Sequence, residues 1–437
     1  MARIAAKLDD AFEVLNLEPI EFSETKTPTA ASDPSFYVEP PPREEEGDGM
    51  PGPGPAEQYR KKLLVQGPTA KLFLSGHVGS GKSTQINKLA TDPIVRGAFS
   101  VVLLRIEGGH QAFLDASQLL FLMAGAIFDF GQEEGLLTED AQWKTHLRDL
   151  DARLYGPSGT VTKERALSAE FTLLFVKVRE ELKLTEHRRR QFRELGETLQ
   201  TLLVDVIKGL VLDIEHGLIR QARHHSILLL IDDLDKVRGP EQQKNIFHTN
   251  LEALVELPLR VLYTVPTGVV FGSNRAQVRR SLEHLYPIRV LDKAPDGFDP
   301  EKFFLPGSDK FFREALDRRI EPHLFTDEAV RLAAIYAGGV LREFFRLLWS
   351  AVFIARHNKL EAVDERAVRA AVRDERRRET MGLLASDYQA LRVIHRTHAL
   401  ATDEDRRYLD EGRVLECYND KTWYDVNPLL WKVLPQD

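Results

Sequence analysis

One eight-residue stretch of the chain, Gly76 to Ser83, reads G-H-V-G-S-G-K-S and fits the pattern G-x-x-x-x-G-K-[ST]. A short apolar run at 72–74 precedes it, and a helix-compatible run at 84–90 follows. Because the pattern lies between a predicted strand and a predicted helix, it indicates a phosphate-binding loop rather than a turn that tolerates glycine. The chain is therefore constrained to an α/β fold in which this loop joins a buried strand to a helix.

The residue types of this loop suit phosphate chemistry. Glycines allow main-chain N–H groups to close around phosphate oxygens, and the positive end of the following helix adds to the attraction for an anion. Lys82 has the length to reach the β- and γ-phosphates, and the Ser83 hydroxyl is placed to ligate Mg²⁺. The residues expected to contact the phosphates are Gly76, Gly79, Ser80, Gly81, Lys82, Ser83 and Thr84.

Length and composition limit the remaining possibilities. A chain of 437 residues with 43% hydrophobic and 29% charged residues is typical of a soluble globular protein with two or three domains. The net charge of −8 disfavours wholesale coating of nucleic acid. Cys417 is the only cysteine, which excludes an intrachain disulfide. The N-terminus lacks a secretory pattern, and the apolar run at 119–128 is too short for a bilayer, so a cytoplasmic protein without a membrane span is expected.

Alternating strand and helix patterns predict a parallel sheet with helices on both faces. The predicted strands are 72–74, 100–106, 227–231, 260–265 and 287–291. Residues 412–426 alternate like a β-hairpin behind two short helices, which is typical of a winged helix. The predicted domains are an N-terminal extension and linker (1–60), a P-loop core (61–300) with a helical insertion (about 115–224), a helical lid (301–382) and a winged-helix domain (383–437).

Two segments outside these motifs have two interpretations each. Arg188, Arg189 and Arg190 near the start of a long predicted helix indicate either a phosphate or partner contact or a solvated face, and the second is favoured. The apolar island at 35–39 either docks onto the body or belongs to a disordered tail. The long helix itself has one buried face, with an apolar stripe at Leu199, Leu203, Val206, Leu210 and Ile214.

A second motif supplies acidic groups. The continuously apolar strand 227–231 ends in Asp232 and Asp233, which places two carboxylates at the carboxyl edge of a parallel sheet, where ligands bind. Asp232 is expected to orient the Mg²⁺ shell, and Asp233 to position and polarise an attacking water. Thr264, at the end of the fourth strand, either contacts the γ-phosphate or is an ordinary strand-end threonine. Arg342, behind Gly338-Gly339 in the lid, is favoured to reach the γ-phosphate.

The order of these motifs resembles the AAA+ and STAND group of ATPases, and the string from Ile231 to Lys236 is similar to the KAP-like and bacterial STAND branches. The resemblance covers roughly 68–437. It implies an ATP-driven switch that uses ATP and Mg²⁺, assembles as a homo-oligomer and closes a lid helix on nucleotide. It also implies that an arginine from a neighbouring copy completes the site, for which Arg275, Arg279 and Arg280 are in place and Arg279 or Arg280 is preferred.

The sequence departs from these families in two respects. Asp233 stands where AAA+ proteins usually have Glu, so slow hydrolysis is expected. The insertion lacks the membrane spans that many KAP-type proteins carry, so membrane attachment is not expected.

Three functions remain open at this point. The preferred one is a switch that regulates a larger complex, with bacterial defence or mobile-element biology as its setting and a protein partner bound through the winged helix or the insertion. The others are a DNA-binding initiator or loader and a nucleotide-binding scaffold with negligible turnover. Residues 385–437 carry seven basic and ten acidic side chains, which disfavours DNA binding. The basic helix at 366–378 leaves a DNA contact possible.

Overall fold

The computed structural model divides the chain into two compact units. The phosphate-loop unit comprises Met1–Tyr59, Ser75–Leu89 and His284–Asp437, and the sheet unit comprises Arg60–Leu74 and Ala90–Glu283. The structure describes residues 4–15, 18–22, 29, 32–41, 54–138, 141–156, 167–223, 226–237, 239–269, 278, 280–294, 297–419 and 421–435.

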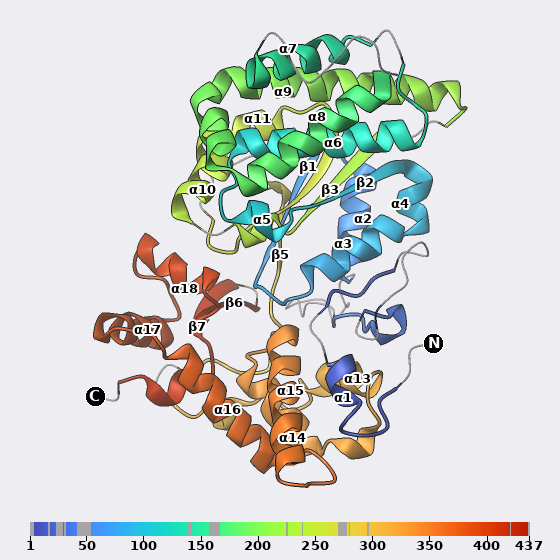
Figure 1. The fold of residues 1–437 in the computed structure, drawn as a ribbon. Helices are drawn as coiled ribbons and strands as arrows, with labels where there is room; N and C mark the ends of the chain where they lie inside the picture. The colour runs from blue at the N-terminus through green and yellow to red at the C-terminus, as the bar shows by residue number, and fades with distance from the viewer. Residues whose placement is uncertain are drawn as a thin grey trace. The chain divides into compact units, whose positions relative to one another are not determined.

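A five-stranded sheet carries the phosphate loop and the acidic motif (Figure 1). The strand order is β2-β3-β4-β1-β5, and the pairs β2–β3, β3–β4 and β4–β1 are parallel. The strands are β1 (Lys71–Gly76), β2 (Phe99–Arg105), β3 (Ser226–Asp232), β4 (Arg260–Thr264) and β5 (Leu282–Leu285). The predicted parallel sheet and the first four predicted strands are therefore confirmed.

The fifth predicted strand, 287–291, is wrong, because the fifth strand of the sheet is β5 and ends before Pro287. A proline has no main-chain N–H with which to continue a ladder. The main chain beyond it bonds elsewhere, since Ile288 N donates to Gly339 O (3.0 Å) and Val290 O accepts from Leu305 N (3.0 Å).

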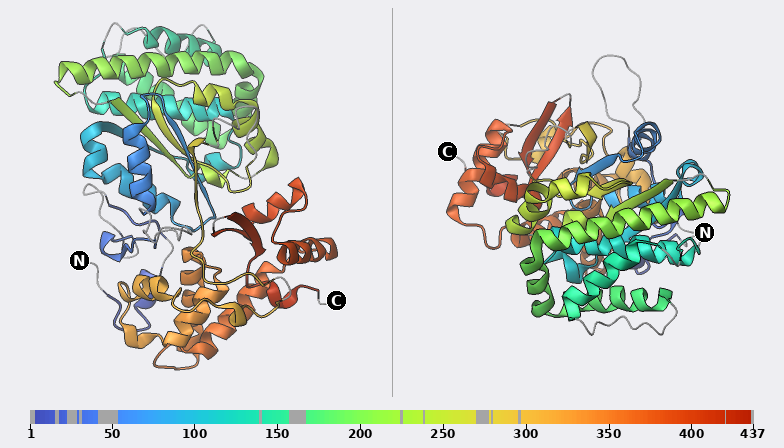
Figure 2. Two further views of the ribbon diagram at one scale, coloured as in Figure 1. Left: turned by 180° about the vertical axis from the view of Figure 1, so that it is seen from behind. Right: turned by 90° about the horizontal axis from the view of Figure 1, so that it is seen from above.

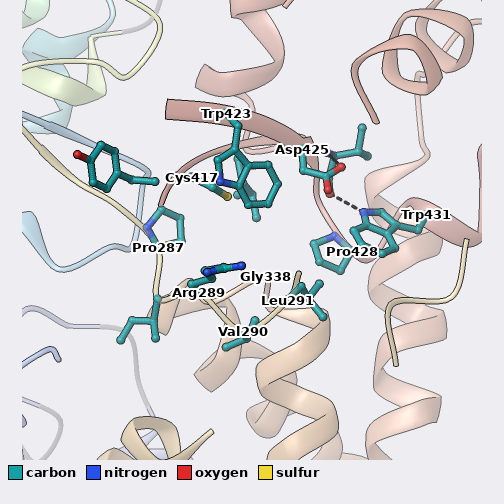
Figure 3. Close-up of a pocket in the computed structure, with 14 residues that line it drawn as sticks. Pro287, Arg289, Val290, Leu291, Gly338, Cys417, Trp423, Asp425, Pro428 and Trp431 are labelled. Atoms are coloured by element: carbon teal, nitrogen blue, oxygen red, sulfur yellow. Dashed lines mark hydrogen bonds between the residues drawn. The ribbon is translucent and has the colours of Figure 1, made fainter. Parts of the chain in front are cut away.

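The segment 287–291 instead faces the C-terminal hairpin (Figure 3). Together they line a cavity of about 30 Å³, with Pro287 and Arg289 on one side and Trp423 and Cys417 on the other. Burial raises the pKa of the Cys417 thiol. An apolar extended segment at the end of a sheet is therefore used here as a support for the hairpin.

The predicted insertion is a bundle of helices in the sheet unit, crossed by the long helix α9 (Figure 2). Leu203, Val206 and Leu210 are fully buried on the predicted face of α9. Gly196 interrupts that helix with φ 47° and ψ −127°, a conformation that glycine tolerates at little cost. The helices of the insertion are α6 (Ala116–Glu133), α7 (Trp143–Tyr155), α8 (Leu167–Leu184) and α9 (Glu186–Arg220).

Neither interpretation of the arginine cluster in α9 holds for its first two members. Arg188 is 5% exposed, donates to Leu154 O (3.0 Å) and pairs with Glu181 (2.6 Å). Arg189 is 8% exposed and donates to the carbonyl oxygens of Leu182 and Lys183. Both therefore hold the insertion together, whereas Arg190 is exposed and pairs with Glu194.

The segment after the sheet is helical, as predicted. Thr326 caps α14, since its hydroxyl accepts from Ala329 N (3.2 Å). The hairpin pairs β6 with β7 from Val414↔Val426 to Asn419↔Lys421. The elements are α13 (Lys310–Asp317), α14 (Asp327–Tyr336), α15 (Leu341–His357), α16 (Glu365–Glu379), α17 (Ala385–Thr397), α18 (Arg406–Asp410), β6 (Val414–Asn419) and β7 (Lys421–Val426).

The described ranges also contain shorter elements. Further helices are α1 (Ala11–Val14), α2 (Pro55–Val65), α3 (Lys82–Thr91), α4 (Pro93–Ala98), α5 (Gly108–Gln111), α10 (Pro240–Lys244) and α11 (Leu251–Val255). Tight turns of 3₁₀ or π geometry are Pro34–Phe36, Leu234–Lys236, Asn245–Thr249, Pro300–Phe303, Pro322–Leu324, Asp403–Asp405 and Trp431–Val433. Within the described ranges, no helix combines the length and apolarity needed to cross a membrane.

The island around Phe36 docks onto its own unit. Phe36 is 1% exposed, and its ring lies 4.9 Å from the Arg319 guanidinium, which also donates to Phe36 O (3.0 Å). On its other side this guanidinium lies 4.6 Å from the Phe345 ring, and burial lowers the pKa of Arg319 to about 10. Of the two interpretations of this segment, docking is the one that the structure supports.

Replacing Asp213 with alanine should destabilise the insertion. Its carboxylate, 8% exposed, accepts from Thr138 N (2.9 Å), Thr138 Oγ1 (2.8 Å) and Trp143 Nε1 (3.0 Å). Three donors would lose their acceptor, so we expect the free energy of unfolding to fall by about 2–4 kcal/mol in urea denaturation. Asp205→Ala, at a half-exposed position of the same helix, is the control and should change it by less than about 0.5 kcal/mol. Equal effects of the two variants would contradict the role of Asp213.

Candidate nucleotide-binding site

The loop between β1 and α3 has the main-chain shape of a phosphate cradle. Gly79 and Gly81 have φ of 91° and 100°, which residues with a Cβ rarely adopt. Ser80 N donates to His77 O (3.0 Å), which closes the turn. The first residue of α3 is Lys82, so the N-terminus of the helix opens into the loop.

Lys82 lies inside this loop. Its side chain is 5% exposed, and Nζ donates to the carbonyl oxygens of His77 (2.9 Å) and Gly76. Ser80 Oγ is buried and has no hydrogen-bond partner among the described residues. A buried ammonium beside a spare hydroxyl and a helix N-terminus is suited to an anionic ligand such as a phosphate.

Helix α15, in the predicted lid, begins against the loop, within the same unit. Arg342 N donates to Gly79 O (3.2 Å), and a Cβ added at Gly79 would lie 2.3 Å from Arg342 Cβ. Only glycine at position 79 permits this approach, since real Cβ atoms do not come within 3.0 Å of such a neighbour. Arg342 is therefore anchored beside the loop by its main chain, while its contact with a γ-phosphate stays a prediction.

His77, at a variable position of the motif, connects the loop to the C-terminal hairpin. Its Nε2 accepts from Glu416 N of β6 (2.7 Å), and its ring meets the edge of the His284 ring at 6.2 Å. Burial, followed by the charge of Lys82, lowers the pKa of His77 to about 3, so the ring is neutral and Nε2 can act as an acceptor. Sequence reasoning missed this residue because the motif allows any amino acid there.

The N-terminal segment holds the other side of α3. Thr84 Oγ1 accepts from Ile20 N (3.2 Å), and Asn87 Nδ2 donates to Ile20 O (2.8 Å). Tyr37 OH accepts from Gln85 Nε2 (3.2 Å) and lies 3.2 Å from Lys88 Nζ. The hydroxyl of Thr84, expected to face phosphate, is engaged by this segment, and its contact with nucleotide remains a prediction.

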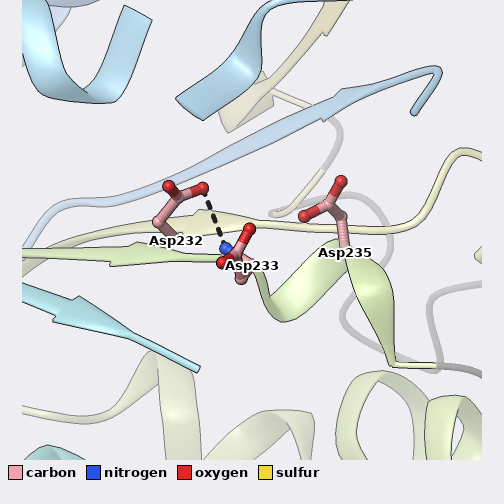
Figure 4. Close-up of side chains that lie close together, drawn as sticks. All are labelled: Asp232, Asp233 and Asp235. Carbon is pink, nitrogen blue, oxygen red and sulfur yellow. Dashed lines mark hydrogen bonds between the residues drawn. The ribbon is translucent and has the colours of Figure 1, made fainter. Parts of the chain in front are cut away.

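Three carboxylates gather where β3 ends, in the sheet unit (Figure 4). Each of Asp232, Asp233 and Asp235 offers an oxygen within 4.8 Å of the others. Asp232 is 2% exposed and its Oδ1 accepts from Asp233 N (2.8 Å), while Asp233 has a left-handed φ of 65°. Hard carboxylate oxygens at this spacing suit a divalent cation such as Mg²⁺. The prediction named the first two acids and missed Asp235, although the spacing D-D-x-D was visible in the sequence.

Thr264 supports this acidic turn from β4. It is fully buried, and its hydroxyl accepts from Leu234 N (3.0 Å) and donates to Ile231 O (3.2 Å). The turn after β3 is thereby fixed by a side chain of the neighbouring strand. A contact between Thr264 and a γ-phosphate or the attacking water stays a prediction.

The structure describes only one of the arginines that are expected to act on a neighbouring copy. Arg275 and Arg279 lie outside the described residues, and Arg280 is exposed on a short helical turn before β5. Their role in another subunit's site is still a prediction.

No family model and no curated protein matches this chain. Among solved structures it is similar to Drosophila ORC bound to DNA, at 12% identity and a TM-score of 0.39 over 98% of this chain and 92% of that one. Cdc6p from Pyrobaculum aerophilum matches at 13% identity and 0.37, over 87% and 92%. The Aeropyrum pernix ORC2 protein in ADPNP–ADP complexes matches at 12% and 0.39, over 86% and 88%. At these values, the function has to be inferred from the chain's own residues.

Replacing Thr264 with valine should loosen the acidic turn. Valine keeps the volume but removes the hydroxyl, leaving Leu234 N and Ile231 O buried without their partner, so we expect a loss of about 1–3 kcal/mol of unfolding free energy. Thr264→Ser keeps the hydroxyl and is the matched control. Denaturant unfolding of the two variants measures the difference, and a valine variant as stable as the serine variant would refute the supporting role.

Proposed function

We propose that this chain is a P-loop ATPase of the AAA+/STAND type whose nucleotide state sets the position of a lid helix and a C-terminal hairpin. Main-chain amides of the loop and Lys82 bind the phosphates, Ser83 and Asp232 hold Mg²⁺, and Asp233 positions the attacking water. When bound, the metal ion neutralises charge on the phosphates. The KAP-like or STAND subtype and the setting in bacterial defence are part of this proposal.

Strand order supports the union of the two motifs. β1 and β3 both pair with β4 in one parallel sheet, so the segments that follow them leave from the same edge. Ligands of open α/β sheets bind at the carboxyl ends of the strands. The phosphate loop continues β1, and Asp232 is the last residue of β3.

The observation that carries the switch is the pair of contacts made on the phosphate loop itself. Arg342 N of the lid bonds to Gly79 O, and Glu416 N of the hairpin bonds to His77 Nε2. Both contacts fall inside the loop that would close around the phosphates. A change in the loop on nucleotide binding or hydrolysis is therefore transmitted to the lid and to the hairpin directly.

The contacts of α16 weaken the alternative of a DNA-binding initiator. Arg369 makes a bidentate pair with Glu301 (2.6 and 2.7 Å), and Arg376 donates to Leu429 O (2.6 Å). Arg366 and Arg378 pair with acids of their own helix end. Arg369 and Arg376 are thus engaged within the protein, whereas Arg366, Arg373, Arg377 and Arg378 are exposed. The acidic C-terminal region offers little to phosphates.

Self-assembly is part of the proposed cycle. An arginine of one copy, Arg279 or Arg280, would complete the site of the next, and the hairpin or the helical insertion would bind a protein partner. Asp233 has a shorter side chain than the glutamate usual in AAA+ proteins, and slow turnover is proposed on that ground. A scaffold with negligible turnover would retain the same binding site.

Lys82→Ala should strongly weaken ATP binding. The change removes a buried ammonium from the loop, and the loss of its charge-assisted hydrogen bonds to phosphate is expected to weaken binding by about 100-fold. Titration of a fluorescent ATP analogue in Mg²⁺ measures this. Lys88→Ala, two turns along α3, is the control and should bind within about threefold of the parent. Unchanged binding by the Lys82 variant would remove the site.

His77→Ala should separate nucleotide binding from the hairpin. The variant loses the acceptor for Glu416 N, so β6 amides should exchange hydrogen faster, and ATP should no longer alter their exchange. ATP affinity should remain within about tenfold, because His77 is not expected to contact phosphate. Hydrogen exchange of β6, measured by mass spectrometry with and without ATP, tests whether His77 transmits the effect of ATP. An ATP response of β6 that survives in this variant would show that His77 does not transmit it.

A further inference from the structure

The outer strand of the sheet presents a free main-chain edge. β2 stands at one end of the strand order and pairs only with β3 in the described sheet (Figure 1). Ile106 N donates to Asp232 O of β3. Because every second residue of a strand bonds to the same neighbour, the even-numbered residues of β2 face β3. Val101 and Leu103 therefore point their N–H and C=O groups outward. In the described part of the chain these two residues make no hydrogen bond on the outward side.

A groove runs beside this edge. It has a volume of about 330 Å³ and lies between β2, α5, α6 and α8. Its floor is apolar where Leu122, Ala126 and Phe130 of α6 line it, and its rim is charged. Both signs of charge are present and already paired at the rim, as Arg179 with Asp129 (3.4 Å) and Lys183 with Glu107 (2.6 Å).

His110 of α5 is the unusual residue of this groove. It is 2% exposed, and neither ring nitrogen has a hydrogen-bond partner among the described residues. Buried polar side chains in native proteins are nearly always hydrogen-bonded, because a buried donor or acceptor without a partner lowers the stability of the fold. A neutral imidazole offers one donor and one acceptor, so a ligand in the groove could satisfy both nitrogens.

We propose that the groove binds an extended polypeptide segment of a protein partner, which adds to the sheet as a strand along β2. An extended strand fits this edge because its own N–H and C=O groups face one side at every second residue. Val101 and Leu103 present their N–H and C=O groups at the same spacing. Its inward side chains lie over Leu122, Ala126 and Phe130, and one polar side chain bonds to His110. Since Arg179 and Glu107 at the rim are already paired with Asp129 and Lys183, and the lining carries both signs of charge, the occupant needs no strong net charge, which distinguishes it from a nucleic acid. This site is independent of the nucleotide chemistry.

The test uses a display library of random twelve-residue peptides, selected on the full-length protein. Val101→Pro removes one outward N–H and leaves the ladder to β3 intact, because residue 101 does not bond to β3. Val101→Thr is its matched control, since threonine keeps the N–H and the β-branched shape. His110→Phe removes both ring nitrogens and so tests the groove at a second position, independent of the strand edge.

Enriched peptides should bind the parent and the Val101→Thr protein equally and lose at least about tenfold in affinity to Val101→Pro and to His110→Phe. Hydrogen exchange of residues 99–105 should slow in the peptide complex. Thermal melting of each variant establishes that it is folded. The proposal would be overturned if the selection yielded no binding peptides. It would also be overturned if the peptides bound the folded Val101→Pro and His110→Phe proteins as tightly as the parent. ATP binding by all three variants should stay at the parental level, so failure here leaves the nucleotide site standing.

Discussion

The turn between β1 and α3 is the constraint on which the rest of the phosphate-loop unit depends. Gly79 takes a positive φ and leaves room for Arg342, so α15 can begin in contact with the loop. His77, two residues earlier, accepts a main-chain hydrogen bond from the hairpin. Two segments from the last third of the chain are therefore positioned by eight residues near its start, so the loop proposed to bind phosphate and the two segments proposed to move lie in one structural unit.

Local chemistry explains what could be predicted from sequence. The loop and the acidic strand end depend on neighbours in the chain, and the structure contains both. The fifth strand was misplaced because 287–291 has the apolar composition of a strand, while Pro287 and the bonds to Gly339 and Leu305 direct it elsewhere. Apolar pattern alone does not distinguish a buried strand from a buried extended segment.

Contacts between distant residues could not be predicted. His77 and Glu416 are 339 positions apart, and no sequence pattern around either residue predicts their hydrogen bond. The same holds for Arg188 and Arg189, whose charges suggested a solvated surface but are satisfied by carbonyl oxygens of α7 and α8. A charged residue is expected to be exposed unless it has partners, and partners of this kind become visible only in the folded chain.

The docking of Phe36 has a consequence for how the protein is made. Its covering residue, Arg319, lies 283 positions later, so at 5–20 residues per second the ribosome needs roughly 15–60 seconds to deliver it. During that interval Phe36 has no native cover from Arg319 or Phe345. Docking of the N-terminal segment therefore cannot precede synthesis of these much later residues of the same unit.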